Sequence, residues 1–341
     1  MPGLLLDTLN GTRGTKVPLW LMRQAGRYLP EYRELRAKKG GFLAMAYDSE
    51  AACEITLQPI DRFGFDGAIL FSDILIVPHA LGQDLQFLAG EGPQLSPRLV
   101  DATLDALTPD PSRYEPIYET VRLCRKRLPE GVTMLGFAGS PWTVATYMVA
   151  GEGSRDQHEA RAMAYRDPAA LQAIIDAIVE ETVNYLSGQI EAGAEAVQLF
   201  DSWAGSLAPD EFEKWVIAPN AAIVAALSEK HPDTPVIGFP KGSGEKLVAY
   251  ARETGVRAVG VDETLDPLWV ARELPAGMAV QGNLDPLLLL AGSDELERRI
   301  ETILDAFADR PHVFNLGHGI DRRTPIEHVQ RLIATVRARQ G

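Results

Sequence analysis

The chain has 341 residues, of which 46% are hydrophobic and 23% are charged, and its 33 basic and 47 acidic side chains give a net charge of −14. This composition supplies enough apolar side chains for a large buried core and excludes general disorder. Nucleic acid and anionic membranes are not expected as partners, because binding them requires a positively charged surface. An anionic ligand therefore needs local basic groups that act against the overall charge.

The N-terminal sequence MPGLLLDTLNG has neither the basic region nor the long apolar region of a signal peptide. Cys53 and Cys124 are the only cysteines, which fits a reducing compartment and excludes a disulfide framework or a multi-cysteine zinc site. The uncharged stretch 131–151 is long enough to span a bilayer, but its glycines and Pro141 predict a strand followed by a helix. We expect a soluble, cytoplasmic protein.

Short, nearly continuous apolar runs recur along the chain, each followed by a polar or glycine-rich break and then a helical pattern. Such runs are typical of parallel strands that helices cover. The eight predicted strands are 17–22, 67–71, 133–137, 196–200, 235–239, 258–261, 279–282 and 313–316. Eight strand-then-helix units predict an α/β protein with a single (β/α)8 TIM barrel over residues 1–341, and an open doubly wound sheet is the alternative. The long interval between Asp73 and Gly131 predicts an insertion after strand two.

Two helices have clear boundary signals. Asp167 and Pro168 suit the N-cap and first position of one helix, and Gly193 suits its end. Thr324 and Glu327 have the spacing of a capping box at the start of the last helix.

The active site of such a barrel lies at the carboxyl ends of its strands. Polar residues follow every predicted strand: Arg23 and Arg27, Asp73, Ser140 and Tyr147, Asp201 and Ser202, Lys241, Asp262, Asn283 and Asp285, and His318. Any one of them would suit an ordinary loop, but their combination indicates a functional site.

Arg23 and Arg27 are separated by Gln-Ala-Gly and can form a fork for one or more carboxylates. The alternative is surface ion pairs to Glu31 or Glu34, each worth about 0–1 kcal/mol. A partly buried arginine–carboxylate contact has a gross attraction of about 4 kcal/mol before desolvation. Their position after the first strand favours the carboxylate-binding interpretation.

The remaining candidates carry different chemistry. Asp73, after an apolar strand, either caps loop amides or stabilises a developing cation. Tyr147 offers a hydroxyl or a core aromatic ring, and Ser202 lacks a nearby histidine and is a hydrogen-bond donor. His318 lies between two glycines, which leave room for a ligand, whereas Lys241 begins an incomplete phosphate-loop pattern.

Two long stretches resemble the signature sequences of the uroporphyrinogen decarboxylases, a family of haem-pathway enzymes. They are PLWLMRQAGRYLPEYR at 18–33 and GFAGSPWTVATYMVAG at 136–151. FSDIL around Asp73, the strand end at Asp201 and Ser202, and NLGHG around His318 are similar to further stretches of that family.

The resemblance implies a (β/α)8 barrel, a homodimer, and no cofactor or metal. It implies that uroporphyrinogen III is the substrate and that its four acetate side chains become methyl groups, which gives coproporphyrinogen III and four CO2. Asp73 and Arg27 would be catalytic. The implied substrate-binding residues are Arg23, Gln24, Ala25, Gly26, Arg27, Asp73, Tyr147, Ser202 and His318. Arg322 and Arg323 lie outside the family motifs, and carboxylate contacts at the rim are a separate hypothesis for them.

The chemistry of decarboxylation agrees with this set of residues. Protonation of a pyrrole carbon gives an iminium-like cation that accepts the electrons left by CO2, and Asp73 would stabilise that cation. Water, a substrate carboxyl group and Asp73 remain open as the proton donor, since a guanidinium is a poor acid.

Two other functions fit parts of the sequence. A barrel methyltransferase would need a zinc thiolate site, and neither cysteine has the required histidine beside it. A non-catalytic binder of tetrapyrroles or organic anions would need the arginines but not Asp73.

Overall fold

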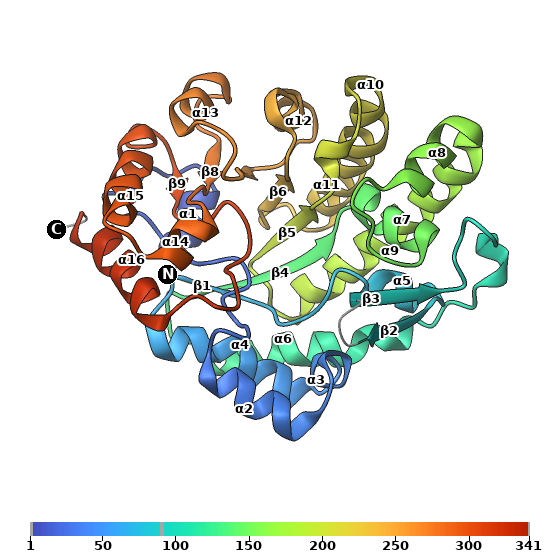
Figure 1. Cartoon of the computed structure of the whole chain (residues 1–341), viewed down its shortest axis with the longest axis horizontal. Coiled ribbons are helices and arrows are strands. Elements are labelled where there is room, and N and C mark those ends of the chain that lie inside the picture. Colours follow the sequence, from blue (N-terminus) through green and yellow to red (C-terminus); the bar gives the residue numbers. More distant parts are fainter. Residues whose placement is uncertain (1–2, 89–91, 340–341) are drawn as a thin grey trace.

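In the computed structural model, which describes residues 3–88 and 92–339, parallel strands form a curled sheet with helices packed around its outer side (Figure 1). Seven strands pair in the order β1-β4-β5-β6-β7-β8-β9. Their bounds are β1 (Gly67–Ile69), β4 (Thr133–Gly139), β5 (Ala196–Asp201), β6 (Val236–Pro240), β7 (Ala258–Gly260), β8 (Ala279–Gln281) and β9 (His312–Val313). A doubly wound sheet reverses its order at a switch point, whereas this sheet follows chain order throughout. The doubly wound alternative is therefore wrong.

The sequence located these seven strands because each is buried almost along its whole length. The predicted first strand, 17–22, is different: only Leu19 forms a bridge, to Phe314. The N–H of Leu19 donates to the Asp66 carboxylate at 2.7 Å, so it is not available for a ladder. The amide of Phe314 nevertheless donates to the carbonyl of Pro18, and the amide of Asp66 donates to the carbonyl of Leu19. This short segment is therefore bonded to residues beside both edge strands, β9 and β1.

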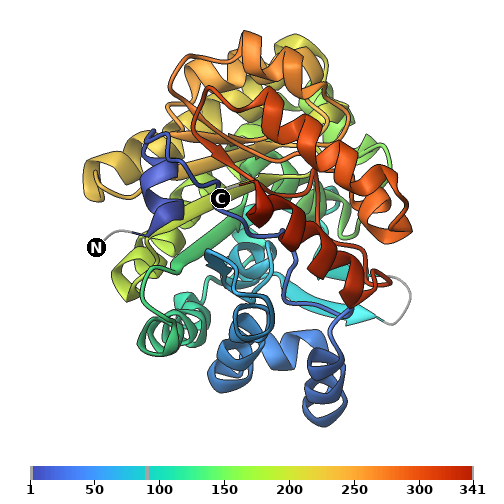
Figure 2. The ribbon, with the colours of Figure 1, turned by 90° about the vertical axis from the view of Figure 1, so that its left-hand side faces the viewer.

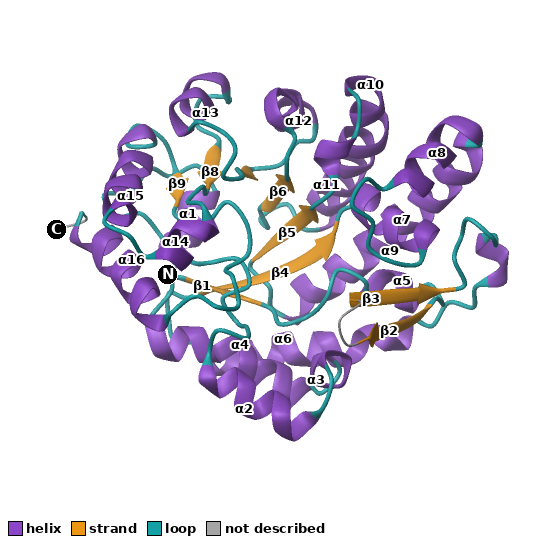
Figure 3. Ribbon diagram, in the orientation of Figure 1, coloured by secondary structure: helices purple, strands orange, loops and turns teal. Residues whose placement is uncertain are grey.

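Helices cover the outer side of the sheet and surround it in both views (Figures 2 and 3). The longer helices are α2 (Pro30–Lys39), α4 (Ser49–Phe63), α6 (Glu115–Arg127), α7 (Pro141–Ala150), α8 (His158–Arg166), α9 (Pro168–Ala192), α11 (Ala218–Lys230), α15 (Glu295–Ala306) and α16 (Ile326–Ala338). The shorter ones are α1 (Leu4–Leu9), α3 (Phe42–Ala46), α5 (Ile76–Ala80), α10 (Pro209–Phe212), α12 (Leu247–Glu253), α13 (Pro267–Glu273) and α14 (Pro286–Ala291).

A separate antiparallel pair, β2 (Asp84–Leu88) and β3 (Gly92–Ser96), lies between β1 and β4 in the sequence. The amide of Leu95 donates to the carbonyl of Gly151 at 2.7 Å, and that of Leu99 donates to Met148 at 2.9 Å. These bonds attach the pair to the end of α7, as its position at the right of Figure 1 indicates.

The signals at the ends of α9 are confirmed, because the Asp167 carboxylate accepts from the amide of Ala170 and Gly193 follows the last residue. The capping box at α16 is wrong. This helix begins at Ile326, after Pro325 in an extended conformation, and has no side-chain cap. Thr324 instead lies in a preceding turn, and its hydroxyl has no hydrogen-bond partner among the described residues.

The uncharged stretch 131–151 divides into β4 and α7, as predicted. Among the helices of residues 3–88 and 92–339, none combines the length and the apolar character needed to cross a membrane.

Candidate active site

A tight turn follows the segment that bridges the sheet edges, and Gln24 holds it in place. The fully buried Gln24 side chain accepts from the amide of Leu21 at 3.0 Å and donates to the carbonyl of Gly67 at 2.9 Å. The amide of Met22 donates to the Asn315 side chain at 2.9 Å. The predicted binding residue Gln24 thus uses its side chain within the protein, where it fixes the start of the turn to β1.

Arg23 occupies the first position of this turn, with φ of 60°. Left-handed backbone is rare for a residue with a side chain. A Cβ on Gly319 would collide with the Arg23 side chain, so the arginine lies directly against the Gly317–Gly319 loop. The contact explains why the position after His318 is a glycine.

The turn also has backbone amides that are available to a ligand. No described group accepts a hydrogen bond from the amides of Ala25, Gly26 and Arg27. Consecutive free amides in a tight turn favour an anion. The turn can therefore bind a carboxylate through its backbone as well as through its arginines.

Arg23 and Arg27 are both exposed, and neither forms an ion pair with any residue in the described ranges. Glu31, one partner in the surface-pair alternative, is bound by Arg62 through two hydrogen bonds of 2.7 and 2.9 Å. Burial raises the pKa of Tyr32, and the Arg36 and Arg27 guanidiniums oppose that rise. Arg27 therefore lies beside α2, and no hydrogen bond or ion pair joins it to Asp73.

Asp73 follows β1 in the turn that leads to α5. One of its oxygens accepts from the amide of Leu75 at 2.8 Å, and the side chain is half-buried. Burial raises the pKa of Asp73, while the Leu75 amide and the Arg23 guanidinium lower it. The loop cap considered for Asp73 is thus present in its geometry, and its electrostatic role stays a prediction.

Tyr147 projects from α7 toward the same space. Burial, followed by the negative charge of Asp73, raises the pKa of the Tyr147 hydroxyl. The Trp203 side chain and the positive charge of Arg23 lower this pKa. A Cβ on Gly153 would lie 3.5 Å from the Tyr147 ring, so the loop after α7 packs against the tyrosine.

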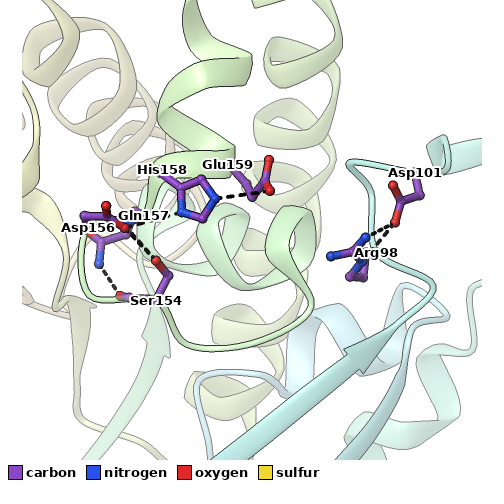
Figure 4. Close-up of polar contacts among 7 residues, drawn as sticks. All are labelled: Arg98, Asp101, Ser154, Asp156, Gln157, His158 and Glu159. Atoms are coloured by element: carbon purple, nitrogen blue, oxygen red, sulfur yellow. Dashed lines mark hydrogen bonds and ion pairs between the residues drawn. The ribbon is translucent and has the colours of Figure 1, made fainter.

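This loop is braced by its own polar groups (Figure 4). The Ser154 hydroxyl donates to Asp156 at 3.0 Å and accepts from the amide of Gln157 at 3.1 Å. His158 lies between Asp156 and Glu159, with its side chain two-thirds exposed. The bracing holds the wall beside Tyr147.

His318 completes the cluster from the opposite end of the chain. Burial, together with the charges of Arg23 and Lys241, lowers the pKa of His318 to about 3. The imidazole is therefore neutral at physiological pH. Its Nδ1 is buried and has no hydrogen-bond partner within the described part of the chain, and its ring lies 6.2 Å from that of Phe239.

In the sequence, Lys241 follows a predicted strand and begins an incomplete phosphate-loop pattern. The amide of Gly242, which such a loop would use, instead donates to the buried Asp262 carboxylate at 2.7 Å. What places Lys241 near the site is its charge acting on His318. At the rim, Arg323 is bound to Asp321 through two side-chain hydrogen bonds, and Arg322 is exposed.

Ser202 follows β5 and is half-buried, and its hydroxyl has no partner among the described residues. Its neighbour Asp201 is fully buried and accepts a hydrogen bond from the Thr143 hydroxyl. Burial raises the pKa of Asp201 to about 7. Sequence reasoning placed Asp201 at a strand end but could not find Thr143, its partner from another element.

Ser140 immediately precedes α7. Pro141 is the first residue of α7, but the Ser140 hydroxyl makes no capping bond. It donates to the Asn220 side chain at 3.0 Å, because α11 packs against this turn and buries the hydroxyl.

Taken together, Arg23 acts electrostatically on Asp73, Tyr147 and His318, which come from the turn after β1, from α7 and from the chain that follows β9. The two cysteines lie elsewhere, buried on α4 and α6. The arrangement places a guanidinium, a carboxylate, a phenol and a neutral imidazole around one space, which suits an anionic ligand that carries hydrogen-bonding groups.

The family model described as uroporphyrinogen decarboxylase (URO-D) matches residues 3–339. The uroporphyrinogen decarboxylase of Novosphingobium aromaticivorans is 72% identical over 337 residues, with 99% of both chains covered. That of Erythrobacter litoralis is 73% identical over 337 residues, again with 99% of both chains covered. The chain belongs to the uroporphyrinogen decarboxylase family, and the resemblance seen at 18–33 and 136–151 is confirmed.

A solved structure of a methyltransferase from Methanosarcina mazei has a similar fold, with a TM-score of 0.83 and 19% sequence identity over 98% of this chain and 97% of the other. At this identity the likeness concerns the fold alone.

The buried Asp201 predicts a measurable pH dependence of stability. Its pKa is higher in the folded protein than the ordinary aspartate value, so the folded state binds the proton more tightly. This stabilisation is present at low pH and is lost as pH rises toward about 7. Relative to Asp201→Asn, the free energy of unfolding of the wild type should fall by about 1 kcal/mol per pH unit between about pH 5 and 7.

Urea unfolding at several pH values measures this difference. Asp309→Asn is the control, since that side chain is 99% exposed and should leave the pH profile unchanged. A constant difference between wild type and Asp201→Asn across this range would contradict the prediction.

Proposed function

We propose that this protein decarboxylates uroporphyrinogen III to coproporphyrinogen III, releasing four CO2 without a cofactor. Membership of the uroporphyrinogen decarboxylase family supports the reaction. The observation that carries the proposal is that the charge of Arg23 acts on all three of Asp73, Tyr147 and His318. A polycarboxylate that bears pyrrole N–H groups matches these charges and hydrogen-bonding groups.

The turn at residues 23–27 holds the substrate carboxylates. Arg23 and Arg27 supply charge, and the free amides of Ala25, Gly26 and Arg27 supply hydrogen bonds. Gln24 contributes by fixing the turn to β1. Neither arginine has an ion pair with a described residue, so no such pair has to be broken when an external anion binds.

Asp73 faces the pyrrole N–H groups and stabilises the iminium-like cation formed when a pyrrole carbon is protonated. The Leu75 amide fixes one of its oxygens, which leaves the other for the substrate. Burial raises the pKa of Asp73, and this favours Asp73 over an arginine as a source of the proton. Tyr147, Ser202 and the neutral His318 contact the side chains of the macrocycle.

The fold supports a closed (β/α)8 barrel in which the segment around Leu19 takes the place of the first strand. Its backbone bonds to Phe314 and Asp66 connect the two edges of the curled sheet. In this interpretation β2, β3 and their flanking turns are an insertion after strand two, and residues 1–341 form one domain. A homodimer and a cytoplasmic location remain predictions.

The competing functions differ in what they require. An organic-anion binder would use Arg23 and Arg27 but not the charge of Asp73. A zinc methyltransferase would need ligands that the buried cysteines on α4 and α6 do not supply together with histidine. No group of metal-binding side chains occurs within residues 3–88 and 92–339.

Anaerobic incubation of the purified protein with uroporphyrinogen III, followed by mass spectrometry, tests the proposal. We expect successive losses of CO2 until four have been released. Binding of the tetrapyrrole without any loss of mass would support the binder instead.

Asp73→Asn should fold normally and lose at least about 100-fold in kcat, because the amide retains the shape and the Leu75 bond but not the negative charge. Asp266→Asn is a matched control, since Asp266 accepts from the amide of Leu268 at the same distance of 2.8 Å. Wild-type kcat in the Asp73 variant would remove this residue from the mechanism.

Arg27→Ala should raise KM and lower kcat, because a carboxylate contact is lost from the turn. Lys38→Ala removes an exposed charge from nearby α2 and serves as the control. Steady-state kinetics at low salt, where electrostatic effects are largest, makes the comparison. Unchanged kinetics of Arg27→Ala under these conditions would show that Arg27 is only a surface residue.

Gly319→Ala should raise KM by about tenfold, a loss of about 1.4 kcal/mol in binding, because the new methyl group would displace Arg23. Gly41→Ala is the control, since a Cβ there has no neighbour within 4 Å. If the two variants have equal KM values, the contact between Arg23 and Gly319 is not important for binding.

A further inference from the structure

One buried carboxylate next to the candidate site has no part in the proposed reaction. Asp201, the last residue of β5, is completely buried. One of its oxygens accepts from the Thr143 hydroxyl of α7, and the other has no hydrogen-bond partner in the described part of the chain. Burying a charge or a polar group without full compensation is costly, so the carboxylate needs an explanation.

The hydroxyl of Thr143 has a direction that the geometry determines. The amide of Trp203 donates to this oxygen at 3.1 Å. Since an amide can only donate and a hydroxyl has a single proton, the Thr143 proton is directed to Asp201. Thr143 thereby connects the carboxylate to the backbone of the loop after β5.

That loop is held at a second point. The carbonyl of Trp203 accepts from the Trp142 indole at 3.2 Å and from the Ser206 hydroxyl at 2.8 Å. Both backbone polar groups of Trp203 are thus engaged. Ser202, which lies between Asp201 and Trp203, is held on both sides.

The hydroxyl of Ser202 itself has no hydrogen-bond partner among the described residues. It is therefore available to a ligand, while the backbone on either side of it is held.

We propose that Asp201 is a positioning residue: through Thr143 it fixes the backbone of Trp203 and thereby the Ser202 hydroxyl, which contacts the substrate. The substrate itself rests on the proposed function. The connection Asp201–Thr143–Trp203 joins the end of β5 to α7 through groups that need not touch the ligand.

Thr143→Val tests the connection, because it removes the hydroxyl and keeps the branched shape. We expect kcat for uroporphyrinogen III to fall by about tenfold, or about 1.4 kcal/mol in the barrier, while KM changes less than kcat. Thr143→Ser restores the hydroxyl and should recover most of kcat. Thr254→Val is the matched control, since Thr254 is also buried and donates a hydrogen bond, to the carbonyl of Tyr250.

A double-mutant cycle with Ser202→Ala separates this role from a general effect on packing. If Asp201 acts through Ser202, Thr143→Val should cause little further loss of kcat once the Ser202 hydroxyl is absent. Wild-type kinetics in Thr143→Val, no recovery in Thr143→Ser, or full additivity with Ser202→Ala would each overturn the proposal.

A second readout does not depend on activity. In protein labelled with 5-fluorotryptophan, the Trp203 resonance is assigned with Trp203→Phe and followed by 19F NMR. It should shift in Thr143→Val and in Asp201→Asn but not in Thr254→Val. If the wild type is inactive but the Trp203 resonance shifts in both variants, the proposed function is refuted and the positioning of Trp203 stands. If the resonance shifts in neither variant, the positioning is refuted.

Discussion

The site depends on one guanidinium that is held in place within a protein of net charge −14. Arg23 acts on the carboxyl of Asp73, the hydroxyl of Tyr147 and the imidazole of His318. Because Arg23 has no ion-pair partner among the described residues, its charge is available to a ligand. A local positive field can thus exist where the whole molecule would repel an anion.

This field also sets the chemical state of its neighbours. His318 stays neutral because burial and two nearby cations disfavour its protonated form. A neutral imidazole can donate with one nitrogen and accept with the other, which a second cation could not do. The site thereby combines charge for carboxylates with neutral hydrogen-bonding groups for the rest of a polar ligand.

Much of the fold could be predicted from the sequence, because a strand buried on both faces appears as a continuous apolar run. The same reasoning failed for 17–22, where a side chain from outside the segment, Asp66, takes the amide of Leu19. The predicted capping box at Thr324 was wrong for a related reason, since Pro325 is extended and α16 begins only at Ile326. Hydropathy and local motifs do not contain the contacts that decide these cases.

The same distinction applies to the site. Arg23, Asp73 and His318 were candidates because a parallel sheet brings the ends of its strands together. The internal role of the Gln24 side chain and the link from Asp201 to Thr143 could not be predicted, because their partners belong to other elements. The position of a residue along a strand predicts whether it lies at the carboxyl end of the sheet. It does not predict whether its side chain already forms hydrogen bonds within the protein.

The bridge between Leu19 and Phe314 has a consequence for how the molecule is made. The amide of Met22 bonds to a side chain 293 residues away, so the turn that carries Arg23 cannot find its final support until Asn315 has been synthesised. Contacts between such distant parts of a chain form slowly. A nascent chain that stops before Asn315 would carry the basic turn without its anchor, and ligand binding would begin only after Asn315 has left the ribosome.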